Sequence, residues 1–234
     1  MTWDLKELRD LIKEIHGENQ LNLANAHINS VVSRIQISRY HLLEAKETIE
    51  QLFHKSEDKV LDASIACFTP NTEQGWELNK AQLKAEANLI GCAQSTHSVA
   101  DIMAYAILYS LKISGIDDLN LSLKDIQKHL VKSNLKDEVI KLLGLNEFSY
   151  LKDFVNTTKH RSLVTSTHYF NNSENNHLDH ALKLNSFSYQ RNKHTKPRSH
   201  PEKGYYQFFE ELQLINEQYV RIGQFVNHYL SCNP

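Results

Sequence analysis

Two polar groups interrupt otherwise apolar helical patterns, and both contain side chains that can do acid–base chemistry. The first is formed by Asn156, Lys159, His160 and Arg161. Asn156 and His160 are four residues apart, so on a helix they share a face, flanked by Lys159 and Arg161. An imidazole beside two cations and an amide can hold a phosphate and transfer a proton at it. The same residues also fit an ordinary polar helix end.

The second group is His97 with Asp101, one helical turn further along an apolar stretch. A histidine on a packed helix surface loses hydration, and a hydrogen bond to a nearby carboxylate compensates for this loss. Two interpretations stay open. The pair is either a structural contact inside a helical bundle or an imidazole that the carboxylate orients towards a cleft.

A strongly basic stretch, residues 190–203, contains a single acidic residue, Glu202. Its candidate nucleic-acid-binding residues are Arg191, Lys193, Lys196 and Arg198, and Lys203 is a further cation. The net charge of −2 excludes a global basic field, so any nucleic-acid surface must be local. The stretch is interpreted either as solvated loop charges or as an arm that follows a phosphate backbone.

No pattern typical of metal, nucleotide or acyl chemistry is present. The predicted helices hold no Glu-x-x-His pair, and His41 flanks its apolar seam, so we expect no metal. The sequence has neither a glycine-rich phosphate loop nor a Gly-x-Ser-x-Gly elbow, so we expect no cofactor. Cys67, Cys92 and Cys232 are scattered without a Cys-x-x-Cys pair, which predicts free, mostly buried thiols in a reducing cytoplasm.

Long helices must position these groups. Glycine (7) and proline (4) are scarce for 234 residues, which favours helices over a turn-rich β fold. Apolar residues recur every seven positions in residues 19–54, in 76–114 and in a final helix that begins near Pro201, which predicts shallow bundle packing. The three seams are Ile28, Ile35, Leu42 and Ile49; Leu83, Ile90, His97, Ala104 and Leu111; and Tyr205, Leu212, Tyr219 and Val226.

Shorter elements complete the predicted architecture. Thr2 is expected to cap a first helix that Gly17 ends, and short helices are expected at 123–132 and 135–143. The helical pattern stops between residues 163 and 204. Residues 164–170 and 182–189 have β-leaning composition, which predicts a hairpin with a mobile tip at 171–176.

The predicted fold is therefore all-α: an up-and-down bundle of long helices with short accessory helices and a β-hairpin insertion before the last helix. Residues 1–234 are expected to form a single domain, with 163–204 as the insertion. No stretch approaches the roughly 18 uncharged apolar residues of a membrane span. We expect a soluble, cytoplasmic protein without membrane contact.

In such a bundle, Asn156-x-x-x-His160 near a helix end resembles the motif of the HEPN superfamily, many members of which are metal-independent ribonucleases of prokaryotic defence and toxin systems. The family motif is an arginine, often a polar residue such as asparagine after it, then three to five further residues and a histidine. Asn156 matches the polar residue and His160 the histidine, whereas Val155 occupies the place of the arginine. Arg161 and His168 also satisfy the bare spacing.

The resemblance implies RNA cleavage in which a ribose 2′-hydroxyl attacks the adjacent phosphate. His160 would be the general base or acid, Arg161 and Lys159 would stabilise charge, and Asn156 would orient the imidazole or the phosphate. His97 and Asp101 are the candidate supporting residues of this site. It also implies a homodimer, an RNA substrate and a cognate protein partner, with no cofactor. The alternative is a non-enzymatic helical interaction or regulatory module.

Overall fold

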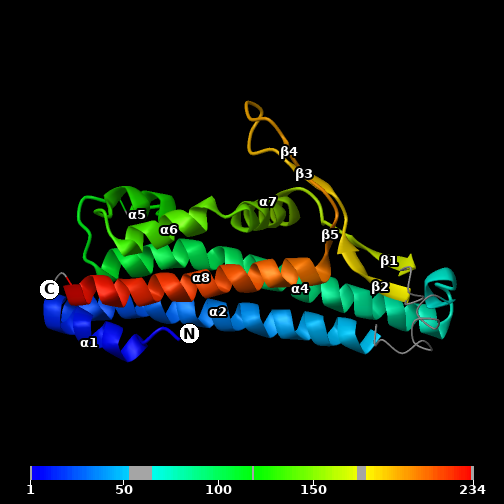
Figure 1. Ribbon diagram of the computed structural model, residues 1–234, viewed down its shortest axis with the longest axis horizontal. Helices are drawn as coiled ribbons and strands as arrows, with labels where there is room; N and C mark the ends of the chain where they lie inside the picture. Colours follow the sequence, from blue (N-terminus) through cyan, green and yellow to red (C-terminus); the bar gives the residue numbers. More distant parts are fainter. Residues whose placement is uncertain (1, 53–64, 118, 173–177, 233–234) are drawn as a thin grey trace. The chain divides into compact units, whose positions relative to one another are not determined.

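The computed structural model describes residues 2–52, 65–117, 119–172 and 178–232 and is an all-α bundle with a small strand insertion before the last helix, as predicted (Figure 1). Its helices are α1 (Leu5–His16), α2 (Glu18–Leu52), α4 (Glu73–Ser110), α5 (Leu123–His129), α6 (Asn134–Gly144), α7 (Asn146–His160) and α8 (Tyr205–Cys232). Its strands are β1 (Ser166–Asn172), β2 (Leu178–Leu184), β3 (Phe187–Tyr189), β4 (Arg198–His200) and β5 (Lys203–Gly204). The short helices α5 and α6 lie where they were expected.

The chain divides into two compact units. The first comprises residues 1–37, 94–152 and 211–234, and the second comprises residues 38–93 and 153–210. The long helices α2, α4 and α8 each contribute to both units. Helix α7 runs from the first unit into the second, and α8 returns from the second to the first. The single-domain organisation expected for residues 1–234 stays a prediction.

Within the second unit, α2 and α4 pack in antiparallel directions. The Ser38 hydroxyl lies 3.4 Å from the Cys92 thiol, and further along α2 the Glu44 carboxylate pairs with Lys84 at 3.3 Å. As the residue number rises along α2, the residue number of the contacting residue on α4 falls, so the two helices are antiparallel. Both contacts lie beside the buried seam of α2.

The seam predicted for α2 is confirmed, whereas the one predicted for α4 is partly wrong. Ile28, Ile35, Leu42 and Ile49 are all buried on α2. On α4, Leu83 is 66% exposed, because a straight helix of 38 residues repeats every 3.6 residues and drifts away from a strict heptad. The buried stripe in this part of α4 instead comprises Leu78, Ala85, Leu89, Cys92 and Ala93.

The heptad of α8 is confirmed, but the helix begins later than predicted. Tyr205, Leu212, Tyr219 and Val226 are at most 2% exposed. Pro201 lies outside the helix, because the following residues 203–204 form β5 and pair with β2. Their backbone groups are used in a sheet ladder, so the first helical turn starts at Tyr205.

The cap of α1 also differs from the prediction. Asp4, rather than Thr2, is the N-cap residue, and its carboxylate accepts hydrogen bonds from the backbone N–H groups of Lys6 and Glu7 at 3.0 and 2.9 Å. Aspartate is at least as good a cap as threonine, and it lies where the helical backbone begins. Gly17 ends α1 as expected, with a φ of 85° that glycine adopts without steric cost.

The strands form two antiparallel arrangements. β1 and β2 make a hairpin as predicted, in the register Ser166 to Leu184, and β5 pairs with the other side of β2. The predicted bounds are partly wrong, because residues 171–172 of the expected tip belong to β1 and residues 187–189 of the expected second strand form β3. Residues 173–176 of the predicted mobile tip lie outside the described residues. A second hairpin, which was not predicted, pairs β3 with β4 in the register Tyr189 to Arg198. The basic stretch is therefore largely the turn and second strand of this hairpin.

Two chain-wide expectations can be compared with the structure. Among the described helices, none combines the length and hydropathy needed to cross a bilayer. All three cysteines are free thiols, as predicted, but only Cys92 is buried, while Cys67 is half-buried and Cys232 is exposed.

Candidate RNA-binding and catalytic surface

The C-terminal turn of α7 carries the predicted catalytic residues, all within the second unit. Asn156 is half-buried, and Lys159, His160 and Arg161 are exposed. The helix ends here, where the backbone N–H of Arg161 donates to the carbonyl oxygen of Thr157 at 3.0 Å. Cations at this end also interact favourably with the negative end of the helix dipole. The four predicted residues thus share one short, largely solvent-facing segment.

The apolar side of the same turns belongs to the core. Phe154 is fully buried and its ring lies 5.1 Å from that of Phe208, edge to face. Val155 is 1% exposed. In the expected alignment with the HEPN motif, Val155 takes the place of the arginine, so a phosphate-binding cation would have to come from another position. The cations at this end of α7 are Lys159 and Arg161.

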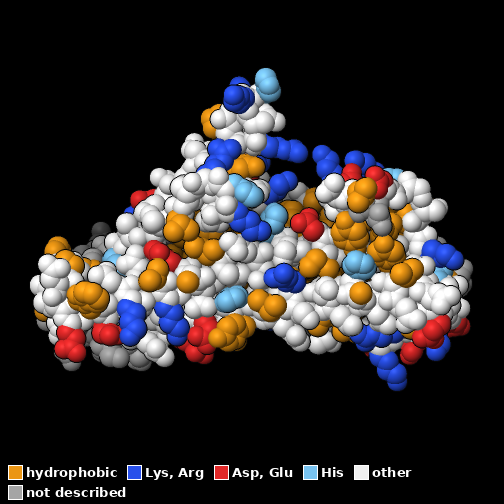
Figure 2. All heavy atoms as spheres, turned by 180° about the vertical axis from the view of Figure 1, so that it is seen from behind, with side chains coloured by type: hydrophobic (Ala, Val, Ile, Leu, Met, Phe, Trp, Pro, Cys, Tyr) orange, Lys and Arg blue, Asp and Glu red, His pale blue; other side chains and the backbone are white. Residues whose placement is uncertain are grey.

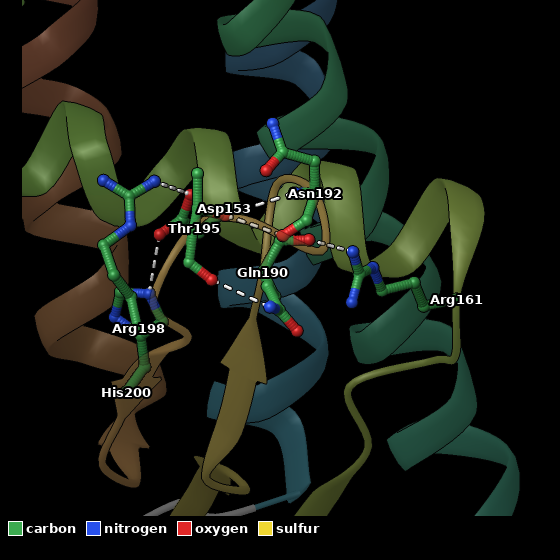
Figure 3. Close-up of polar contacts among 7 residues, drawn as sticks. All are labelled: Asp153, Arg161, Gln190, Asn192, Thr195, Arg198 and His200. Atoms are coloured by element: carbon green, nitrogen blue, oxygen red, sulfur yellow. Dashed lines mark hydrogen bonds and ion pairs between the residues drawn. The ribbon is translucent and has the colours of Figure 1, made fainter.

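Asp153 links α7 to the second hairpin and was given no role by the sequence reasoning. Its carboxylate is fully buried and accepts hydrogen bonds from Arg198 Nη2 and from His200 Nε2, the latter at 2.9 Å (Figure 3). The His200 ring also stacks on Phe187, with ring centroids 4.7 Å apart. A buried charge is costly unless it is paired, so these contacts satisfy Asp153 and fix β4 against the helix. The only sequence signal was an aspartate beside the apolar Phe154.

The turn between β3 and β4 carries three of the four predicted nucleic-acid-binding residues, and the fourth, Arg198, begins β4 and pairs with Asp153. The turn projects away from the helical part of its own unit (Figure 1), and Figure 2 shows Lys, Arg and His side chains gathered on the projection. The turn is held by internal hydrogen bonds, such as the one from Gln190 Nε2 to the carbonyl oxygen of Thr195 at 2.8 Å. The predicted residues Arg191, Lys193, Lys196 and Arg198 are all exposed.

Arg161 joins the helix end to this turn. Its Nη2 donates to the carbonyl oxygen of Gln190, and its guanidinium carbon lies 5.2 Å from the centre of the Tyr189 ring (Figure 3). Two groups that the sequence suggested separately are therefore in contact. We call them together the basic surface, which comprises Asn156, Lys159, His160, Arg161, Arg191, Lys193, Lys196 and Arg198.

His160 is the last residue of α7 and is exposed. It follows Asp153 by seven residues, nearly two full helical turns, so the two residues share a face about 10 Å apart along the axis. Asp153 contacts β4 on that face.

His97 and Asp101, the predicted supporting residues, lie on α4 in the first unit, whereas the basic surface lies in the second. His97 is half-buried and Asp101 is exposed. Asp101 acts electrostatically on Tyr219: burial raises the pKa of the Tyr219 hydroxyl well above its usual value, and the charge of Asp101 raises that pKa further. The supporting role of His97 and Asp101 stays a prediction.

Within the described ranges, no cluster of three or more His, Cys, Asp and Glu side chains is arranged to hold a metal ion. Asp153 and His200 form a carboxylate–imidazole pair, but the third member of that group is the cation Arg198. The basic surface itself consists of cations, an imidazole and an amide, which are groups that can bind an anion and exchange a proton.

Fold and surface together define an all-α bundle protein with a strand insertion that presents cations beside a helix end. Family models, curated proteins and solved structures were all compared with the chain, and none gives a match.

Proposed function

We propose that the protein binds single-stranded RNA on the basic surface and cleaves it without a metal ion, as a HEPN-like ribonuclease. The observation that supports this most directly is the bond from Arg161 to the Gln190 carbonyl, which brings the helix end with His160 against the basic turn. A strand that neutralises its phosphates on the turn would then lie beside an exposed imidazole.

Each residue has a defined part in this reaction. His160 removes the proton of the ribose 2′-hydroxyl, or donates one to the leaving oxygen. The 2′-oxygen forms a bond to phosphorus while the bond from phosphorus to the 5′-oxygen breaks, which leaves a 2′,3′-cyclic phosphate and a 5′-hydroxyl. Arg161 and Lys159 stabilise the added negative charge, and Asn156 orients the imidazole or the phosphate. A homodimer would allow two copies of His160 to perform the two proton transfers.

The test is cleavage of end-labelled RNA in the presence of EDTA. We expect cyclic-phosphate products from the wild type and a rate about 10² to 10⁴ lower in His160→Ala. His129→Ala is the matched control, because His129 is also an exposed histidine in the last turn of a helix, α5. Intact RNA after incubation with concentrated wild-type protein would reject the ribonuclease, as would equal activity in His160→Ala.

A second candidate function is a non-enzymatic interaction module, and the burial of Val155 favours it. Without the motif arginine, charge stabilisation worth about 3 to 4 kcal/mol is absent unless Arg161 supplies it. Such a module would bind RNA or a cognate protein on the same surface without turnover. It predicts that His160→Ala changes binding or stability in a protein that leaves RNA intact.

A further inference from the structure

Tyr189 on β3 is in contact with two arginines of the basic surface. The guanidinium carbon of Arg161 lies 5.2 Å from the centre of its ring, and that of Arg198 lies 6.0 Å from it. The two arginines come from different elements, the end of α7 and strand β4. Cation–π attraction of this kind restrains a guanidinium, which is otherwise at the end of a long flexible chain.

The hairpin around Tyr189 is itself fixed at two places. Tyr189 pairs with Arg198 across the β3–β4 ladder, and Arg198 is bound to the buried carboxylate of Asp153. On the other side, Gln190 accepts a hydrogen bond from Arg161 through its carbonyl oxygen and donates from its side chain to Thr195. Figure 3 shows Arg198 and Arg161 on either side of Gln190.

Arg161 is therefore held by a ring and a carbonyl while its side chain stays exposed. A guanidinium has five N–H donors, so the bond to the Gln190 carbonyl uses only part of its capacity. Holding such a group before the ligand arrives lowers the entropy lost on binding. This is the arrangement expected of a preorganised ligand for a phosphate oxygen.

We propose that Tyr189 is a positioning residue that holds Arg161 ready to bind a backbone phosphate of RNA, so that Arg161 compensates for the buried Val155. This inference rests on the proposed RNA binding and names the group that prepares its main cation. Tyr189 acts here through Arg161. A tyrosine that stacked directly on a base would make a different contribution, which the following experiment separates.

The experiment measures binding of a short fluorescent 2′-O-methyl oligoribonucleotide, which lacks the attacking hydroxyl and so reports binding alone. Affinity is measured over a series of salt concentrations for wild type, Tyr189→Leu, Tyr189→Phe, Arg161→Gln and Tyr189→Leu with Arg161→Gln. Arg39→Gln, an exposed arginine on α2, is the charge-matched control. Circular dichroism of each variant checks that the helices and hairpin are retained.

We expect Tyr189→Leu to weaken binding about two- to five-fold and Tyr189→Phe to leave it unchanged, because the ring and not the hydroxyl holds the guanidinium. Arg161→Gln should reduce the magnitude of the slope of log affinity against log salt concentration by about 0.7, because one phosphate contact is lost. Tyr189→Leu should also reduce the magnitude of this slope. In the Arg161→Gln background, Tyr189→Leu should have no further effect.

Three results would overturn this inference. Equal binding by wild type and Tyr189→Leu removes any role for the ring. If Tyr189→Leu weakens RNA binding as much in the Arg161→Gln background as in the wild type, and leaves the salt slope unchanged, Tyr189 stacks directly on a base instead. Failure of the wild type to bind the oligonucleotide rejects the proposed function, and the inference with it, whereas the first two results leave RNA binding in place.

Discussion

Nε2 of His200 and Oδ2 of Asp153 are 2.9 Å apart, across 47 residues of chain. An ionised carboxylate only accepts hydrogen bonds, so Nε2 carries the proton in this contact. Arg198 donates to the other oxygen of the same carboxylate. One buried side chain thus fixes the strand that presents the basic turn.

Replacement of Asp153 by asparagine should destabilise the protein. The amide keeps the size of the carboxylate but offers only one oxygen to two donors, so we expect a loss of about 1 to 3 kcal/mol in the free energy of unfolding. Urea denaturation followed by circular dichroism measures it. Asp10→Asn, at an exposed position of α1, should change the value by less than about 0.5 kcal/mol. Equal stability of the two variants would show that the contact with β4 contributes nothing.

Removal of the Arg161 charge should affect turnover more than removal of a cation on the turn. If Arg161 stabilises the phosphoryl oxygens, Arg161→Gln lowers the cleavage rate in EDTA by about 10² to 10³. Arg191→Gln should mainly weaken binding, because Arg191 is an exposed cation of the projecting turn. Single-turnover rates at saturating protein separate the two effects. Equal rates for both variants would assign Arg161 to binding alone.

Stability should fall as the solution becomes acidic, partly through His27. Burial lowers the pKa of His27 below 6.5, and its ring stacks on those of Tyr105 and Tyr109 at 5.3 and 4.9 Å. As the pH falls, His27 of the unfolded chain therefore binds a proton before His27 of the folded chain does. The contribution of neutral His27 to stability is complete above pH 6.5 and is lost as the pH falls towards the pKa of the folded state. His27→Phe keeps a stacked ring without titration.

The measurement is the melting temperature between pH 7.5 and 5. His27→Phe should show a smaller decrease than the wild type. Some decrease should persist, because burial and the charge of Lys112 also lower the pKa of His16. An identical pH profile in the two proteins would contradict the role of His27.

Replacement of Gly223 by alanine should displace Trp3. An added Cβ would lie 2.6 Å from Cε2 of the indole, closer than packed atoms allow, and Trp3 now donates through Nε1 to Asn227 at 3.0 Å. With Trp76 replaced by phenylalanine, Trp3 is the sole tryptophan, so its emission should shift to the red and iodide should quench it more. Gly144→Ala is the control, because its Cβ would meet nothing within 4 Å. Unchanged emission in Gly223→Ala would contradict the predicted displacement.

The sequence by itself determined the long helices and most of their buried faces. A repeat such as Ile28, Ile35, Leu42 and Ile49 places apolar side chains on one face of a helix. The repeat therefore predicts which face is buried, whatever element packs against it. The β1–β2 hairpin was likewise readable from β-leaning composition between residues 163 and 204. Two local predictions were wrong: Asp4 rather than Thr2 caps α1, because it lies where the helical backbone begins, and Leu83 is exposed, because a 3.6-residue helix drifts away from a strict heptad.

Only the tertiary structure brought Asp153 to Arg198 and His200, and Arg161 to Tyr189 and Gln190. These contacts join residues 28 to 47 positions apart, and no helical or strand period links such positions. They depend on a second hairpin whose three-residue strands leave too short a pattern to recognise. The sequence thus supplied the two sets of charged residues, and packing of β3 and β4 on α7 decided that they form one surface.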